Sequence, residues 1–206
     1  MEKYFTNNNR QSLRLDEYDY STPGVYFVTI CVNKHLCLFG GIEDEDMKVN
    51  AAGRMVWKWW NELNNKFEII QTDEAVVMPN HFHGIVIINE NSNVGAALCG
   101  RPTKHQQMDG NNNKPPNTPG QPHRVAPTSL FDVMEWFKTM TTNEYIRNVK
   151  QSGWLPFHKK LWQRSYYDRI VRDEDELNSI REYVMYNPLK WGVDQNHPQN
   201  WSLNDR

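Results

Sequence analysis

Hydrophobic residues recur along the chain at two spacings, one typical of strands and one typical of helices. A run of β-branched and aromatic residues at 25–32 follows a Ser-Thr-Pro-Gly turn signal and predicts a buried strand. Residues 36–39 form a second short apolar run before two glycines and predict another strand. Apolar residues then repeat at helical spacing across residues 51–66, which predicts an amphipathic helix.

Two further apolar runs follow this helix, separated by a short turn. The first lies within residues 67–78 and the second covers residues 81–88. The turn Pro79-Asn80 between them is too short for a crossover connection. The two runs therefore predict an antiparallel pair of strands.

Residues 89–127 contain few large apolar side chains and many Asn, Pro and Gly residues. This composition predicts a flexible insertion rather than a folded unit. Because neither flank has a complete set of elements, we expect a single domain over residues 1–206 that carries this insertion.

Helical spacing resumes after the insertion. Ser129 and Asp132 have the spacing of a capping box, with Asp in place of the usual Glu or Gln. Residues 161–171 are rich in aromatic and β-branched side chains and predict a strand.

A last helix is predicted from a second capping pattern. Asp173 and Glu176 mark its beginning, and Pro188 disfavours helical geometry at Asn187, so the helix should end about there. Short strands that alternate with helices and include a hairpin indicate an α+β fold. We expect a ferredoxin-like sandwich, a central antiparallel sheet with helices packed on it.

The composition is that of a globular chain, with 38% hydrophobic and 12% aromatic residues among 206. The three cysteines, Cys31, Cys37 and Cys99, form no Cys-x-x-Cys pair and indicate neither a disulfide framework nor a zinc knuckle. The N-terminus has no apolar signal region, and no apolar run approaches the length of a membrane span. We therefore expect a cytoplasmic protein without a membrane partner.

The charge balance gives no support to nucleic-acid binding, because 23 basic residues face 25 acidic ones and the net charge is −2. Basic residues nevertheless cluster near the predicted strand at 161–171. They form either a solvated face or a tentative DNA-binding surface, and they are Lys159, Lys160, Arg164, Arg169 and Arg172.

A histidine pair is the first candidate for chemistry. His81 and His83 are two residues apart on a predicted strand, so both imidazoles point to one face while Phe82 points to the other. Such a pair can chelate one metal ion, although the spacing also arises by chance. Two histidines completed by oxygen ligands suit Mg²⁺ or Mn²⁺ better than zinc. A histidine-triad nucleotide hydrolase would need His at position 85, where Ile85 stands.

A tyrosine on the last predicted helix is the second candidate. Tyr183 and Asn187 are four residues apart and share one helix face, so a metal bound by the amide would lie beside the phenol. Equally, Tyr183 can be a packing residue and Asn187 a helix cap. The rival nucleophiles are Tyr166, Tyr167 and Tyr186.

These residues together resemble the HUH single-tyrosine transposases, and within them the branch of REP-associated tyrosine transposases. The resemblance covers residues 10–90 and 128–192. It rests on an ordered series of motifs: YDY at 18–20, PGVYFVT at 23–29, VVMPNHFH at 76–83, WQRSYYDR at 162–169, IREY at 180–183 and YNP at 186–188.

The resemblance implies a ferredoxin-like catalytic domain that uses a divalent metal. By position, His81 and His83 are the paired ligands, Asn187 is the third ligand and Tyr183 is the nucleophile. The implied reaction cleaves a DNA strand, leaves a 5′-phosphotyrosine and a free 3′-OH, and can rejoin strands. The implied substrate is single-stranded DNA with hairpin-forming palindromes, and some relatives act as homodimers.

We therefore expect a metal-dependent transposase or nickase of single-stranded DNA that uses Mg²⁺ or Mn²⁺. One alternative is a hairpin-binding protein of the same fold without catalysis. A third possibility is an unrelated metal hydrolase of small phosphate esters, in which Tyr183 would be dispensable.

Overall fold

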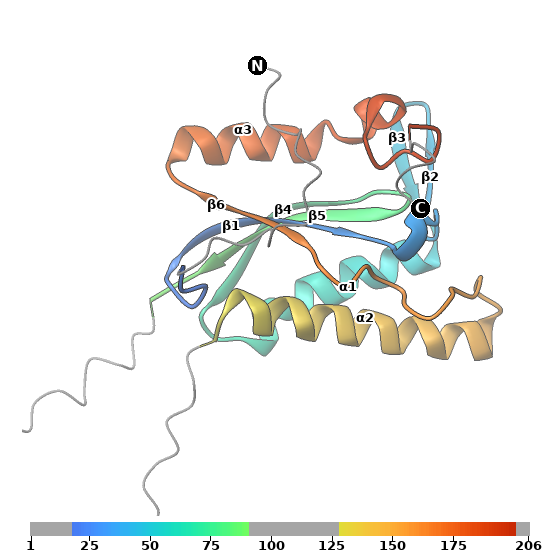
Figure 1. Ribbon diagram of the computed structural model, residues 1–206, viewed down its shortest axis with the longest axis horizontal. Coiled ribbons are helices and arrows are strands. Elements are labelled where there is room, and N and C mark those ends of the chain that lie inside the picture. Colours follow the sequence, from blue (N-terminus) through green and yellow to red (C-terminus); the bar gives the residue numbers. More distant parts are fainter. Residues whose placement is uncertain (1–17, 91–127, 201–206) are drawn as a thin grey trace, which may run out of the picture.

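The centre of the molecule is a sheet of four antiparallel strands in the order β4-β5-β1-β6 (Figure 1). Strand β1 (Gly24–Cys31) pairs with β5 (His81–Ile88) on one side and with β6 (Tyr167–Val171) on the other. Strand β4 (Ile70–Val77) pairs with β5 and forms the opposite edge. The predicted hairpin is therefore confirmed as β4 and β5.

The computed structural model describes residues 18–90 and 128–200. Most of the predicted insertion at 89–127 lies outside these residues. Within the described part of the chain, no helix is both long enough and apolar enough to cross a membrane.

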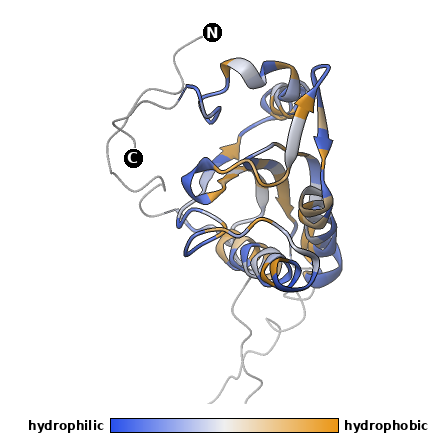
Figure 2. Ribbon diagram, turned by 90° about the vertical axis from the view of Figure 1, so that its right-hand side faces the viewer, coloured by the Kyte–Doolittle hydropathy of each residue, from blue (hydrophilic) through white to orange (hydrophobic). Residues whose placement is uncertain are grey.

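The helices cover both faces of the sheet (Figure 1). Helices α1 (Ala51–Lys66) and α2 (Leu130–Ser152) lie on one face, and α3 (Glu174–Met185) lies on the other. The ferredoxin-like α+β prediction is confirmed by this arrangement. In Figure 2 the central strands are largely hydrophobic, whereas α1 and α2 alternate hydrophobic and hydrophilic residues, as expected for helices with one buried side.

The larger core lies between the sheet and α1 and α2. The ring centroid of Phe82 is 4.7 Å from that of Trp60 and 5.4 Å from that of Phe137. Gly84 lies beneath the same indole, where an added Cβ would come within 2.5 Å of the Trp60 ring. The even-numbered residues of β5 therefore build this core, and the odd-numbered histidines face α3.

The helix boundaries follow their capping signals. The Ser129 side chain and the Asp132 side chain each bond the other's backbone, so the predicted capping box is confirmed. Asp173 caps α3 through the Glu176 backbone nitrogen. The Glu176 carboxylate does not return to the cap and instead accepts a hydrogen bond from the backbone of Arg172.

The strand predicted at residues 36–39 is wrong. Strand β2 (Gly40–Glu43) begins just after this segment and pairs with β3 (Asp46–Val49) in a separate two-stranded hairpin. Leu38 and Phe39 are buried by packing rather than by pairing. The turn of this hairpin is Asp44-Glu45, both with positive φ, and it lacks the Asn-Gly or Asp-Gly signal that predicts such turns.

The strand predicted over residues 161–171 is shorter than expected, since β6 covers only Tyr167–Val171. The residues just before β6 form no regular ladder, and an isolated antiparallel bridge joins Trp162 to Val32, the residue after β1. Helix α3 ends at Met185, and Asn187 stands just beyond it with helical dihedral angles, at the start of the 3₁₀ segment Pro188–Val193.

Candidate active site

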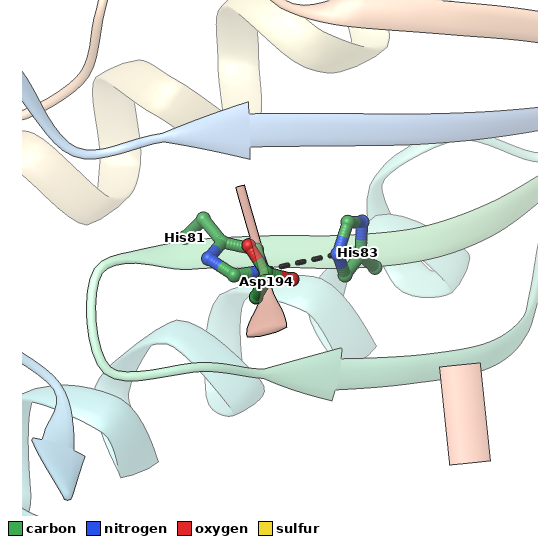
Figure 3. A group of neighbouring side chains, drawn as sticks. All are labelled: His81, His83 and Asp194. Carbon is green, nitrogen blue, oxygen red and sulfur yellow. Dashed lines mark hydrogen bonds and ion pairs between the residues drawn. The ribbon is translucent and has the colours of Figure 1, made fainter. Parts of the chain in front are cut away.

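The two histidines meet at the beginning of β5, on the face of the sheet that α3 covers (Figure 3). Both side chains are fully buried, and His81 Nε2 lies 3.0 Å from His83 Nε2. Two nitrogen ligands that bind one ion at right angles, with bonds of about 2.1 Å, lie about 3.0 Å apart. The separation of the two imidazoles therefore fits one divalent ion.

Hydrogen bonds to the outer ring nitrogens orient both imidazoles. His81 Nδ1 lies 2.9 Å from the amide oxygen of Asn80, and His83 Nδ1 lies 2.7 Å from the Thr29 hydroxyl. The Asn80 amide nitrogen donates to the carbonyls of His35 and Asn196, so its oxygen must face His81. His81 Nδ1 therefore carries the proton, and Nε2 presents a lone pair to the site.

Burial keeps the pair uncharged. It lowers the pKa of His83 to about 3, and it lowers the pKa of His81 well below its ordinary value, with the neighbouring His83 adding to the shift. Both rings are therefore neutral at neutral pH, and neutral imidazole is the form that binds metals.

Asp194 adds an oxygen donor to this group, and the side chain of Asn187 is near enough to affect the pKa values of His81 and Tyr183. Asp194 Oδ2 lies 3.9 Å from His81 Nε2, and ligand atoms of Asp194 and both histidines lie within 4.8 Å of one another. Asn187 is buried, and no described residue hydrogen-bonds its amide oxygen. Leaving a buried acceptor without a partner costs free energy, which a bound cation would recover. The His-His-Asp group could bind a metal.

Tyr183 reaches the same place from α3. Its hydroxyl lies 3.4 Å from His83 Nε2, and its ring packs edge-on against Phe27 with a centroid distance of 5.9 Å. Burial raises the pKa of Tyr183 to about 12, the negative charge of Asp194 adds to the shift, and the Asn187 side chain opposes it. The phenol is therefore protonated at neutral pH and lies beside the histidines of its own chain.

The rival tyrosines lie elsewhere. Tyr166 is buried in the core under α1 and α2, whereas Tyr167 and Tyr186 are about half exposed. Tyr183 is the one whose hydroxyl contacts the histidine pair.

The five basic residues of the tentative DNA-binding surface separate into two groups. Lys159, Lys160 and Arg164 line a groove of about 730 Å³ beside α2, to which Lys138 also contributes. Of the remaining two, Arg169 lies in β6 and Arg172 just after it, and both pair with the carboxylate of Glu176 in the first turn of α3.

Asp194 and Thr29 were missed by the sequence reasoning. Asp194 is a lone acidic residue in a polar segment after Trp191, and nothing local distinguishes it from a solvated charge. Thr29 was placed on a strand, and its role depends on strand pairing, because it lies directly opposite His83 in the register of β1 and β5.

Comparisons with known proteins agree with this fold. No protein-family model matches the sequence. An uncharacterized protein of Haemophilus influenzae is 32% identical over 188 residues, which cover 91% of this chain and 93% of that protein. A REP-associated tyrosine transposase, solved bound to a REP hairpin, superposes with a TM-score of 0.51 at 14% identity, over 88% of this chain and 76% of the other. The chain therefore belongs to the family of this Haemophilus influenzae protein, and it has the fold of the REP-associated tyrosine transposase.

Proposed function

We propose that this protein is a metal-dependent transposase or nickase that cuts and rejoins single-stranded DNA beside hairpins. The observation that carries the proposal is a convergence at one buried point. Two neutral imidazoles from β5 and the hydroxyl of Tyr183 from α3 meet there, and the side chain of Asn187, whose buried amide oxygen has no hydrogen-bond partner among the described residues, acts on both His81 and Tyr183.

In this proposal His81, His83 and Asn187 hold a divalent ion, Mg²⁺ or Mn²⁺, and Asp194 adds a charged oxygen to the group. When bound, such an ion polarises a phosphate oxygen and offsets the charge that develops on phosphorus. Asn80 and Thr29 orient the two imidazoles through hydrogen bonds to their Nδ1 atoms, which point away from the metal site.

Tyr183 is the nucleophile. Its oxygen forms a bond to phosphorus as the bond to the 3′ oxygen breaks, which leaves a 5′-phosphotyrosine and a free 3′-OH. The phenolic proton must leave, and we assign its acceptance to Asp194, whose carboxylate acts on Tyr183 electrostatically. The 3′ oxygen gains a proton as it departs, and the reverse sequence rejoins the strands.

Hairpin DNA is the proposed partner for two reasons. The transposase that shares this fold was solved with a REP hairpin, and the groove beside α2 is lined by basic side chains. Lys138, Lys159, Lys160 and Arg164 give this groove a positive surface, with Glu135 as its acidic residue. Neutralising phosphates with Lys and Arg is the general basis of affinity for DNA.

The test is covalent capture of labelled DNA. Single-stranded DNA with a hairpin, labelled at its 3′ end, is incubated with the full-length protein and Mn²⁺ or Mg²⁺, and then run on a denaturing gel. We expect a labelled protein band that depends on metal, because the 3′ fragment stays attached to Tyr183. Tyr183→Phe should abolish the band and leave hairpin binding within about twofold.

Tyr186→Phe is the matched control, because Tyr186 is close in sequence but half exposed. It should leave the adduct unchanged. An adduct that survives Tyr183→Phe and disappears with Tyr186→Phe would refute the assignment of the nucleophile. Hairpin binding without any metal-dependent adduct would instead identify a DNA-binding protein that lacks catalysis.

A further inference from the structure

Helix α3 is tied by ion pairs to both edges of the sheet. At its beginning, Glu176 pairs with Arg169 of β6 and with Arg172. Further along, Arg181 pairs with Asp73 of β4. Strands β6 and β4 are the two edge strands of the sheet, so the helix spans the sheet between two ionic anchors (Figure 1).

The anchor on β4 attaches the part of α3 nearest Tyr183, and it consists of several hydrogen bonds from one arginine to one carboxylate. Arg181 Nη2 lies 2.5 Å from Asp73 Oδ2, and Arg181 Nε lies 3.2 Å from both carboxylate oxygens. The side chain of Asp73 is 16% exposed and that of Arg181 is 33% exposed. Arg181 lowers the pKa of Asp73. The remaining guanidinium nitrogen bonds Asn178 and Glu174, so the Arg181 side chain is also held on its own helix.

Asp73 occupies an irregular position in β4. The register with β5 shifts between Thr72 and Ala75, so Asp73 and Glu74 lie in a β-bulge rather than in the regular ladder. Bulges redirect side chains and are frequent next to active sites. Asp73 has no partner in the regular register of β4 and β5, and its carboxylate is bound by Arg181 of α3.

The apolar cluster under α3 is smaller than the core under α1 and α2. Its buried members are Leu177, Ile180 and Val184 against Ile85, and the partly buried residues around them are Val25, Phe27, Val76, Val171 and Tyr183. Hydrophobic contacts are non-directional, whereas an arginine fork on a carboxylate fixes geometry. Arg181 precedes Tyr183 by two residues, or about 3 Å along the helix axis. A constraint on Arg181 therefore limits how far Tyr183 can slide or rotate.

We propose that the Asp73–Arg181 pair is a positioning clamp that holds α3 in register and keeps the Tyr183 hydroxyl at the histidine pair of the same chain. The proposal rests on the function proposed above for Tyr183. Among the described residues, the hydrogen bonds of Arg181 and Asp73 reach neither the histidines nor Tyr183, so the pair acts through the placement of the helix.

The first test separates positioning from binding. Arg181→Gln and Asp73→Asn each remove the pair, and Glu174→Gln is the matched control, because it removes only the charge of an exposed partner of Arg181 on its own helix. At saturating hairpin DNA, we expect the rate of adduct formation to fall about 10- to 100-fold in the two clamp variants, since a misplacement of about 1 Å can cost that much. Hairpin affinity and Mn²⁺ affinity should stay within about twofold, and Glu174→Gln should match the wild type.

A charge reversal, Asp73→Arg combined with Arg181→Asp, checks the pairing itself. The rate of adduct formation in the double variant should exceed that of either single reversal, because the ion pair forms again with its two charges exchanged between strand and helix.

A second readout does not depend on activity. Hydrogen exchange in Arg181→Gln should rise over residues 174–185, while β1, β5, α1 and α2 keep wild-type protection. The clamp is overturned if adduct rate and α3 exchange both stay at wild-type values. It is equally overturned if exchange rises throughout the protein and hairpin affinity falls in parallel, which would show a general loss of stability. Absence of any adduct in the wild type would refute the proposed function, and the exchange pattern would still decide the clamp.

Discussion

The two faces of the sheet are built from the same strands but in opposite ways. The face under α1 and α2 is a large apolar core in which Trp60, Phe82 and Phe137 contact one another. The face under α3 has a small apolar cluster and holds the buried polar groups His81 and His83. Burying such groups costs free energy, and the large core on the other face offsets that cost.

Strand β5 contributes side chains both to the large apolar core and to the histidine site. Its alternation sends Phe82, Gly84 and Val86 to the core and His81 and His83 to the site. The backbone that presents the imidazoles is thus held by the best-packed part of the molecule. A rigid presentation of ligands is what a metal site requires.

The largest expected effect is on stability, at Phe82. Phe82→Ala should lower the free energy of unfolding by about 3–5 kcal/mol, because it opens a cavity among well-packed rings. Ile85→Ala, on the opposite face of the same strand, should cost nearer to about 2 kcal/mol, since it removes a smaller side chain from a smaller apolar cluster. Urea denaturation of both variants measures the difference. Equal costs would contradict the comparison of the two faces.

A second prediction concerns metal affinity and pairs one threonine from each face. Thr29→Val removes the hydroxyl that orients His83 and should weaken Mn²⁺ binding about tenfold. Thr141→Val is the control, because Thr141 is buried under the other face and bonds Trp162. It should cost about 1 kcal/mol of stability and leave Mn²⁺ affinity unchanged. Titration calorimetry checks both, and equal affinities for Mn²⁺ in the two variants would count against an orienting role for Thr29.

The sheet and the helices could be predicted because each depends on local periodicity. The hairpin of β4 and β5 and the capping box at Ser129 followed from the residues themselves. The β2–β3 hairpin could not be predicted, because Asp44 and Glu45 adopt positive φ without a local signal. Its turn conformation depends on the pairing around it.

The candidate site could be predicted only in part, because some of its contacts depend on the tertiary path of the chain. The spacing of His81 and His83 and of Tyr183 and Asn187 showed which side chains share a face, and the family resemblance brought the two pairs together. Asp194 joins them only through the path of the chain after α3. The Arg181–Asp73 pair joins residues 108 positions apart through a bulge, and no sequence spacing encodes such a contact.

The smallest expected effect tests the other anchor of α3. Hydrogen bonding from Arg172 is the main cause that lowers the pKa of Glu176 to about 2, with the charge of Arg169 adding to it. A carboxylate whose pKa falls on folding stabilises the protein above its ordinary pKa of 4.5, and that contribution is lost as pH drops towards 2. Glu176→Gln should therefore reduce stability at pH 7 and reduce it progressively less between pH 4.5 and 2.

The size of this effect should be under about 1 kcal/mol, because Arg169 and Arg172 are 45% and 75% exposed and solvent screens the pair. Asp73→Asn should cost more than Glu176→Gln at pH 7, since its arginine partner is only 33% exposed. Thermal unfolding of both variants across pH 2–7 measures the two contributions. A cost of Glu176→Gln that does not shrink in acid would show that the ionised carboxylate is not its source. If Glu176→Gln costs as much as Asp73→Asn at pH 7, the anchor on β6 is as important to α3 as the anchor on β4, and the placement of Tyr183 cannot be assigned mainly to Arg181.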